Sequence, residues 1–457
     1  MKVYDDILGL VGHTPLVRLN RLPGNGAATV YAKLEQLNPG GSVKDRMAVN
    51  MVRRAEHAGL IGPGATLVES TSGNTGLGLA MAAAVRGYHC VCTMPDKMSK
   101  EKIDMLKAFG ARVVVTRTDL PHEHPDNYVQ VAKRIARDTP GAFYTDQYYN
   151  PANPEAHYLT TGPEIWEDTD GVIDCLVGGI GTGGTISGAA KYLKERAAEV
   201  GRELRVVCPD PVGSIYRDMY YEGKAPQPGI YRVEGIGHDF MVGTLDFSVI
   251  DEVRTVSDRD SFLAARRLAR AEGIFAGGSS GTALHTAIEV ARELGTGKTL
   301  VVIICDSGDR YLSKYFDDDW MKDLGFLGPD ERYGTVRDLL RAHGTRIEFA
   351  DADETLEHVA RRMAGLGISQ MPVEINGELR MIHESDILQG LVSGACVTGD
   401  PVSGVATALE GRVSLDDPLS RVQKVFDENN VAVAVDQQQV VGIVSKIDVV
   451  TYLAERG

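Results

Sequence analysis

A lysine near the amino terminus has the setting of a reactive amine. It lies in residues 39–46 (PGGSVKDR), and the pattern that follows, through Glu56, predicts a helix that begins at Lys44. The positive end of the helix dipole disfavours an ammonium ion and favours a neutral amine. A neutral amine is the nucleophile that Schiff-base chemistry needs. From this segment alone, the alternative interpretation is that Lys44 is an ordinary surface lysine in a helix cap.

Two other segments place hydroxyls, amides and glycines where a predicted helix begins. Residues 69–76 (ESTSGNTG) follow a predicted strand and precede an apolar helix over residues 77–85. Backbone amides and hydroxyls at the start of a helix bind a carboxylate or a phosphate, and a plain helix cap would need only one such side chain. Residues 276–281 (AGGSSG) also precede an apolar helix, but there capping by the serines is an equal alternative.

A third segment, residues 178–185 (GGIGTGGT), is the richest in glycine. Its five glycines let backbone N–H groups close around a phosphate, and Thr182 and Thr185 add hydroxyls suited to a phosphate monoester. The segment lacks the Lys-Ser/Thr ending of an ATP-binding loop. Residues 179–184 also satisfy the pattern GxGxxG, and a predicted strand leads to Asp210, so a dinucleotide site in an oxidoreductase remains an alternative.

Short apolar runs alternate with helical patterns between residues 28 and 310, and these elements must position the polar segments. The alternation predicts parallel sheets covered by helices, so the fold class is α/β. Ligands bind such sheets at the carboxyl ends of the strands, where the polar segments fall. The predicted strands cover residues 28–34, 66–69, 89–94, 112–116, 172–177, 204–207 and 300–305.

The organisation changes near residue 330. A chain of 457 residues is expected to form two or three domains, and glycine and proline in residues 325–330 predict a linker. Beyond it, two segments match at an offset of 62 to 63 residues, as Asp386 and Asp448 illustrate. We therefore expect a catalytic domain over 1–325, a linker over 326–332, and two repeats over 333–395 and 396–457.

Composition excludes several classes of protein. The 48 basic and 63 acidic residues give a net charge of −15, which disfavours binding to nucleic acid or to an anionic membrane. The sequence shows neither a signal peptide nor a run of about 18 apolar residues, so we expect a cytoplasmic protein. No cysteines are spaced as a zinc site, and His122 and His124 fit a solvated loop better than a metal site, so we expect no metal.

The polar segments resemble, in order, motifs of the pyridoxal-phosphate enzymes of fold type II, the family of the tryptophan synthase β-subunit, and within it the cystathionine β-synthases. The resemblance begins at residues 12–19 (GHTPLVRL), includes GGSVKDR, TSGNTG, GTGGT and GGSSG, and ends with the duplicated tail, so it covers nearly the whole chain. It implies two parallel-sheet subdomains that bind pyridoxal 5′-phosphate, followed by a C-terminal α/β regulatory domain pair.

The resemblance also implies roles for particular residues. Lys44 would form the Schiff base with the cofactor, Asn74 would contact its 3′-oxygen, and Ser279 would bond its pyridine nitrogen. The cofactor phosphate would be held by Gly181, Thr182, Gly183, Gly184 and Thr185. The substrate carboxylate would be held by Thr71, Ser72, Thr75 and Gln147.

The implied reaction is a β-replacement that condenses L-serine with L-homocysteine to L-cystathionine and water, in transsulfuration, with sulfide production as a side reaction. Cysteine synthase, which uses O-acetylserine, is the nearest alternative. Three features favour the first reading: the double glycine before Ser42, residues 234–240 (EGIGHDF), and residues 317–321 (DDDWM) followed by the tail. The substrates are small amino acids, and the assembly is expected to be a homodimer or a homotetramer.

Two departures from the family pattern are visible. Animal members have a tyrosine where His238 stands, which bears on how the second substrate is handled. They also carry a haem-binding extension before the catalytic fold, and this sequence starts almost at that fold, so no haem is expected.

The tail resembles paired domains that bind adenosine ligands through a Ser/Thr-x-x-Asp motif. Ser445 and Asp448 fit this motif, and S-adenosylmethionine is the regulatory ligand that the resemblance implies. The first copy has His383 in place of the hydroxyl residue before Asp386. A dimerising tail without a ligand remains an alternative, as does a non-catalytic adenosine sensor, against which Lys44, Asn74 and Ser279 argue.

Overall fold

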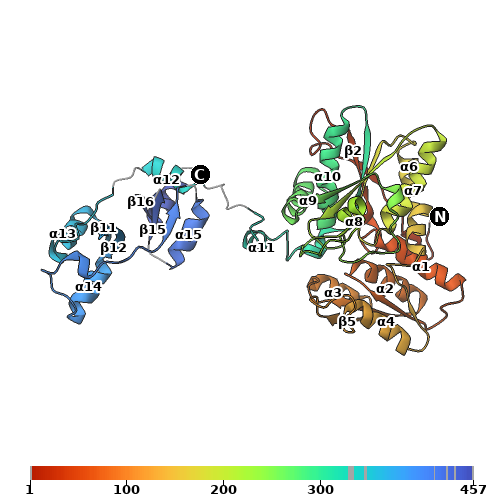
Figure 1. The fold of residues 1–457 in the computed structure, drawn as a ribbon, viewed down its shortest axis with the longest axis horizontal. Helices are drawn as coiled ribbons and strands as arrows, with labels where there is room; N and C mark the ends of the chain where they lie inside the picture. Colours follow the sequence, from red (N-terminus) through yellow and green to blue (C-terminus); the bar gives the residue numbers. More distant parts are fainter. Residues whose placement is uncertain are drawn as a thin grey trace. The chain divides into compact units, whose positions relative to one another are not determined.

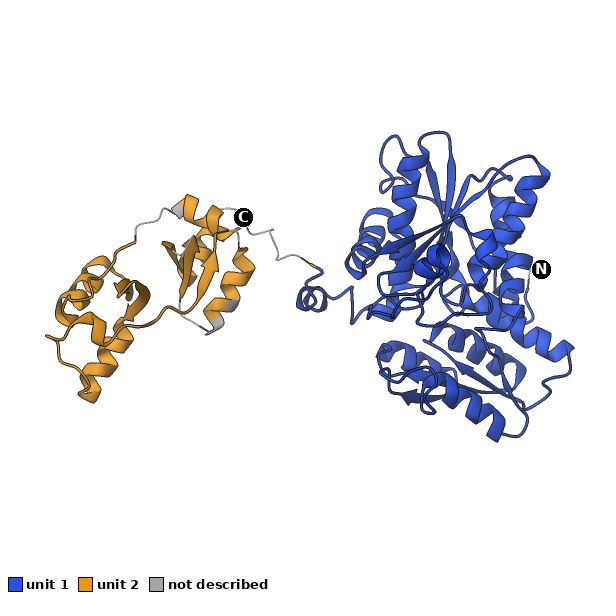
Figure 2. Cartoon of the chain, in the orientation of Figure 1, with its two compact units in different colours: residues 1–326 blue, residues 327–457 orange. Residues whose placement is uncertain are grey.

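The chain folds into two compact units, Met1–Phe326 and Leu327–Gly457 (Figure 2). The computed structural model describes residues 3–327, 334–343, 347–415, 417–428, 431–436 and 439–454. Most of the expected linker, residues 328–332, lies outside the described residues.

Two sheets with helices around them form the first unit (Figure 1). The larger has the order β1-β2-β10-β7-β8-β9 and is parallel except for β1. Its strands are β1 Leu16–Arg18, β2 Thr29–Leu34, β10 Thr299–Ile304, β7 Cys175–Val177, β8 Arg205–Pro211 and β9 Glu252–Val256. The smaller sheet, in the order β5-β4-β3-β6, is wholly parallel and consists of β5 Arg112–Thr116, β4 His89–Pro95, β3 Thr66–Ser70 and β6 Ala142–Tyr144. The expected α/β class and the two parallel sheets are confirmed.

Strand β10 lies inside the larger sheet because its sequence is apolar at every position from Leu300 to Ile304. Leu300, Val302 and Ile304 pack into one core, with α9 (Asp258–Glu272) and α10 (Gly278–Leu294). Val301 and Ile303 pack into the other core, with α7 (Gly184–Glu199). A strand that is covered on both faces reads as a continuous apolar run, which is the pattern that the sequence shows.

The smaller sheet is an insertion in the larger one, because its four strands fall between β2 and β7 in the sequence. Its helices are α1 Lys44–His57, α2 Asn74–Arg86, α3 Lys100–Ala108 and α4 Tyr128–Asp138. Met47 of α1 and Leu77 of α2 share one apolar core with Leu67 of β3. The chain therefore passes between the two sheets before α1 and again after β6, and loops from both meet at this junction.

Shorter elements complete the first unit. They are η1 Ile7–Leu10, η2 Glu35–Leu37, α5 Ala152–Ala156, η3 His157–Thr161, α6 Gly162–Asp168, α8 Tyr216–Glu222, η4 Phe247–Val249, η5 Gly308–Tyr311 and α11 Asp318–Asp323.

Among its described residues, the second unit contains two three-stranded sheets, β11-β12-β13 and β14-β15-β16. Helix α12 (Val336–His343) packs into the core of the second sheet, although it precedes the first sheet in sequence. Strand β13 (Thr407–Ala408) shows the opposite exchange. It falls in the expected second repeat, 396–457, but pairs with β12 of the first sheet. The other elements are α13 Leu356–Leu366, β11 Gln370–Ile375, β12 Glu378–His383, α14 Glu384–Ser393, η7 Val402–Gly404, β14 Arg412–Ser414, α15 Leu419–Glu428, β15 Val431–Asp436, β16 Gln439–Ser445 and α16 Lys446–Ala454.

In the part of the chain that the structure describes, no helix has both the length and the apolar character that crossing a membrane requires. The described residues also contain no group of three His, Cys, Asp or Glu side chains that could hold a metal ion. Cys90 and Cys92 are both buried on β4, with their sulfurs 3.8 Å apart.

Candidate active site

Lys44 is the first residue of α1 and lies beside the carboxyl end of β10. The Val43 N–H donates to the Cys305 carbonyl at 2.8 Å, and Ser42 forms a bridge with Asp306. Burial lowers the pKa of the Lys44 amine, while Cys305 and Asp306 act in the opposite direction. The lowered pKa agrees with the expectation from the sequence, but its cause is burial at the junction of the two sheets.

The thiol and the carboxyl next to Lys44 differ in charge. Burial raises the pKa of the Cys305 thiol to about 12, so this thiol is neutral near pH 7. Asp306 accepts hydrogen bonds from Asn74 and from the Tyr311 hydroxyl, as expected of a carboxylate. Asp306 is therefore the negative charge that Lys44 meets.

The residues expected to hold a carboxylate lie in the loop from β3 to α2, in the first turn of α2 and just after β6. Thr75 donates to Gln147 Oε1 at 2.6 Å, and Gln147 Nε2 donates to the Ser70 carbonyl at 2.7 Å. The Thr71 hydroxyl oxygen accepts from the N–H of Gly73 at 2.9 Å, and Ser72 is half-buried in the same loop. The structure therefore brings Thr71, Ser72, Thr75 and Gln147 to the start of α2.

The glycines between β7 and α7 form a closely packed cradle. A Cβ on Gly181 would lie 2.4 Å from the Gly235 carbonyl oxygen, and one on Gly184 would lie 2.0 Å from Asn153 Oδ1. Gly183 has a φ of +83°, which side chains rarely adopt. The loop ends at the amino terminus of the 16-residue helix α7, where backbone N–H groups are free to bind a phosphate.

Hydroxyls and buried polar groups complete this cradle. Thr182 Oγ1 accepts from Asn153 Nδ2 at 2.9 Å, so the hydroxyl hydrogen of Thr182 remains to be donated elsewhere. Thr185 Oγ1 lies 3.2 Å from His157 Nε2. Asn153 Oδ1 is buried and has no hydrogen-bond partner among the described residues. The remaining hydroxyl hydrogen of Thr182 and the packed glycine loop fit a phosphate group.

Ser279 lies in the first turn of α10 and is 3% exposed. A Cβ on Gly235 would come within 3.9 Å of its hydroxyl, and the Gly235 carbonyl contacts the cradle at Gly181. A neutral hydroxyl, a phosphate cradle and a buried amine of lowered pKa thus surround one junction. This donor set fits pyridoxal phosphate.

Residues 234–240 lie between the two parts of the site, which are the helices of the smaller sheet and the glycine cradle before α7. Glu234 accepts from Lys102 of α3 at 2.6 Å, and Lys314 pairs with the same carboxylate. The ring of His238 packs edge-on against Tyr148, with centroids 5.0 Å apart. This segment therefore lies between the smaller sheet's helices and the phosphate cradle.

Ser445 and Asp448 lie in the second unit, whereas the other predicted site residues lie in the first. Ser445 Oγ donates to Asp448 Oδ2 at 2.6 Å, and the Ser445 N–H donates to the same oxygen at 2.8 Å. In the first repeat, Asp386 Oδ2 lies 3.5 Å from Thr407 Oγ1. The aspartate of the second repeat is thus held at the start of α16.

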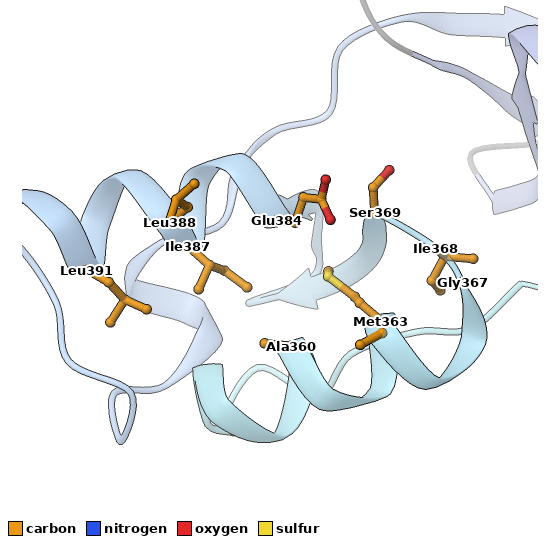
Figure 3. Close-up of a pocket in the computed structure, with 10 residues that line it drawn as sticks. Ala360, Met363, Gly367, Ile368, Ser369, Glu384, Ile387, Leu388 and Leu391 are labelled. Carbon is orange, nitrogen blue, oxygen red and sulfur yellow. The ribbon is translucent and has the colours of Figure 1, made fainter.

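A cavity of about 460 Å³ lies between α13 and α14 of the second unit (Figure 3). Its walls are apolar apart from Ser369 and Glu384, and the figure shows Met363 and Ile387 facing each other across it. None of the predicted site residues lines it. Its lining contains no amine, so it cannot perform the chemistry expected of Lys44.

Sequence reasoning missed several polar residues that hold the site together, among them Glu69, Asn153, His157, Asp306 and Arg310. One signal was available, because Asp306 directly follows a predicted strand and so falls at the ligand-binding edge of the sheet. The others come from segments whose approach to the site depends on the tertiary fold.

The comparisons with known proteins agree with this geometry. Residues 7–306 match the family model described as pyridoxal-phosphate dependent enzyme, and residues 336–393 and 412–455 match the CBS domain. The chain belongs to the family of pyridoxal-phosphate dependent enzymes and carries paired CBS domains. Within this family it is similar to cystathionine beta-synthases over nearly its whole length, so the expected resemblance is confirmed.

Two relatives and one solved structure show the extent of the similarity. The cystathionine beta-synthase of Dictyostelium discoideum is 36% identical over 99% of this chain and 92% of its own length. The cysteine synthase of Staphylococcus aureus is 43% identical, but over 68% of this chain and 96% of its own length. The structure of O-ureido-L-serine synthase has a TM-score of 0.63 and 38% identity, covering 70% of this chain and 99% of that one.

Glu69 supplies a prediction about pH. This buried carboxyl accepts from the N–H groups of Ser70 and Gln147, yet burial dominates and raises its pKa from 4.5 to about 8. Between those values the folded chain keeps a proton that the unfolded chain releases, so the free energy of unfolding falls as pH rises. Glu69→Gln, which cannot titrate, should gain stability relative to wild type by about 1 to 3 kcal/mol between about pH 5 and about pH 8.

Urea unfolding of both proteins across this pH range measures the difference in their free energies of unfolding. An effect of the amide that does not depend on pH cancels when the difference at about pH 5 is subtracted from that at about pH 8. Glu123→Gln, at an exposed glutamate, serves as the control and should show no such trend. A stability difference for Glu69→Gln that does not grow with pH would contradict the raised pKa.

Proposed function

We propose that this chain condenses L-serine with L-homocysteine to L-cystathionine and water. The observation that carries the proposal is the similarity to cystathionine beta-synthases over almost the full chain, with both CBS domains included. The buried amine of Lys44 beside a phosphate cradle supports the same chemistry.

The residues that would hold pyridoxal phosphate come from both sheets. Gly181 to Thr185 would bind its phosphate at the start of α7, Asn74 would donate to its ring oxygen, and Ser279 would face its ring nitrogen. When bound, the cofactor supplies an electron sink for the carbanion at the substrate's α-carbon. Because Ser279 is a neutral hydroxyl, it would not hold a proton on the ring nitrogen, which favours β-replacement over transamination.

Lys44 is the proposed general base and general acid. Burial lowers its pKa, which favours the neutral amine that can take the proton from the α-carbon of serine. The resulting ammonium can donate a proton to the β-hydroxyl, which leaves as water. Between these two proton transfers, the carboxylate of Asp306 stabilises the positive charge on Lys44. The homocysteine thiol then forms the new bond at the β-carbon. Its proton passes to the neutral Lys44 amine, which returns it to the α-carbon.

Substrate binding is proposed for the loop at the start of α2. The hydroxyls of Thr71, Ser72 and Thr75 and the amide of Gln147 would hold the amino-acid carboxylate, helped by the positive end of the α2 dipole. The bond between Thr75 and Gln147 supports a common role, because it places the two side chains together.

Several further properties are part of the proposal. The compact units support a catalytic domain over 1–325, followed by a linker over 326–332 and repeats over 333–395 and 396–457. Six free cysteines fit the reducing cytoplasm. Val3, Tyr4, Ile7 and Leu10 are exposed apolar residues near the amino terminus, which supports a homodimer or a homotetramer.

Lys44→Ala tests the catalytic assignment. The variant should lose the visible absorption band of the bound cofactor, and turnover should fall by at least about a hundredfold. Absorption spectra of the purified holoenzyme and a cystathionine assay measure the two effects. Lys100→Ala, at a lysine whose side chain is 86% exposed, is the control and should behave as wild type. An active Lys44→Ala enzyme would refute the assignment.

The choice of substrates needs its own assay, because the match to cysteine synthase favours a second candidate function. We expect serine with homocysteine to be turned over at a higher kcat/KM than O-acetylserine with sulfide. Both pairs are measured on one enzyme preparation. A preference for the second pair would make the chain a cysteine synthase.

S-adenosylmethionine is the proposed ligand of the second unit, with Asp448 accepting from its ribose hydroxyls. At a hundredfold excess over its Kd the ligand would add about 2.7 kcal/mol of stability, which should raise Tm. Asp448→Ala should abolish the rise, while Asp386→Ala, at the corresponding position of the first repeat, should retain it. An unchanged Tm in the wild type would show that the tail does not bind this ligand.

A further inference from the structure

A buried guanidinium lies next to the proposed cofactor contact Asn74. Arg310, on η5, is 1% exposed. Its Nη1 donates to Asn74 Oδ1, and its Nη2 donates to the Gly40 carbonyl. One side chain thus contacts both the start of α2 and the loop that leads into Lys44.

The other end of the Asn74 amide faces a carboxylate. Asn74 Nδ2 donates to Asp306 Oδ2 at 2.8 Å, and the Tyr311 hydroxyl donates to the same oxygen at 2.6 Å. Asp306 Oδ1 is buried without a hydrogen-bond partner among the described residues, and a Cβ on Gly277 would lie 2.0 Å from it. The carboxylate is therefore held tightly in place.

This arrangement allows only one orientation of the amide. A flipped Asn74 would point its NH₂ group at the guanidinium, which has only donors, and its oxygen at the carboxylate, which has only acceptors. Both contacts would be repulsive. Among the described residues, Nδ2 donates to Asp306 alone, so its second hydrogen stays available for a ligand.

The double glycine before Lys44 makes room for Arg310. Gly41 has a φ of +78°, and a Cβ there would lie 2.5 Å from Arg310 Nη2. The Gly40 N–H donates to Asp45 at 2.6 Å while its carbonyl accepts from Arg310. The loop before α1 and the amide of Asn74 are consequently fixed by the same guanidinium.

We propose that Arg310 and Asp306 are positioning residues for Asn74, which hold its amide so that the second Nδ2 hydrogen is directed to the ring oxygen of the cofactor. The inference rests on the proposed function, in which Asn74 contacts the cofactor. Preorganisation is the physical benefit, since an amide already held in place loses no rotational freedom when the cofactor binds.

A double-mutant cycle on the holoenzyme tests the proposal, with cofactor Kd and the visible absorption spectrum as readouts. Arg310→Lys keeps the charge but lacks the planar fork that spans Gly40 and Asn74. It should weaken cofactor binding by about tenfold and shift the spectrum in the same direction as Asn74→Ala. In the Asn74→Ala background, Arg310→Lys should lose most of its effect on both readouts, keeping at most the part that comes from its contact with Gly40.

Asp306→Asn provides a second variant. Because it also removes the charge beside Lys44, only the part of its spectral shift that disappears in the Asn74→Ala background reports on the amide. An amide at this position no longer selects one orientation of Asn74, so it should shift the spectrum as Arg310→Lys does. Asp309→Asn, an exposed carboxyl neighbouring Arg310 in η5, makes the same change of charge and should leave the spectrum unchanged.

Two results would overturn the inference. One is additivity, in which Arg310→Lys has its full effect without Asn74. The other is a lower Tm with a wild-type spectrum and Kd, which would mean that Arg310 only stabilises the fold. If Asn74→Ala itself leaves the spectrum unchanged, Asn74 does not contact the cofactor and the inference fails with that contact. The proposed function is tested apart from this, by the loss of the absorption band in Lys44→Ala.

Discussion

The catalytic unit depends on the contact between its two sheets at the carboxyl end of β10. Strand β10 belongs to the larger sheet, and Asp306 just beyond it bonds to Asn74 at the start of α2, which belongs to the smaller one. Ser42 and Val43 pair with the same segment and place Lys44 beside it. If these buried contacts were lost, the amine, the amide and the phosphate cradle would no longer share one site.

Burial and charge are balanced at this junction. Burial lowers the pKa of Lys44, and the carboxylate of Asp306 partly offsets the effect. Ser279 contributes a hydroxyl without charge, and the thiol of Cys305 is protonated. The site therefore places an amine of lowered pKa beside the carboxylate of Asp306, which is the setting that the proposed acid–base role of Lys44 needs.

Glycine serves different purposes along the site. In the cradle, Gly181 and Gly184 allow backbone and side chain to approach where a Cβ would overlap with neighbours. Before Lys44, Gly41 allows a left-handed turn and leaves space for Arg310. The surplus of glycine visible in the composition thus reflects close packing around buried polar groups as well as turns.

The sequence by itself determined the α/β class, the presence of parallel sheets and the polar segments at the strand ends, because period and residue type are local properties of the chain. The family resemblance added that there are two such sheets. The sequence also pointed to Lys44 and to the glycine loop as parts of one site. Only the tertiary structure decided that Asp306, Arg310 and Asn153 support these residues, and that α12 packs with the second repeat rather than the first. Those contacts join segments far apart in the chain, and the burial that lowers the pKa of Lys44 exists only once the sheets have packed together.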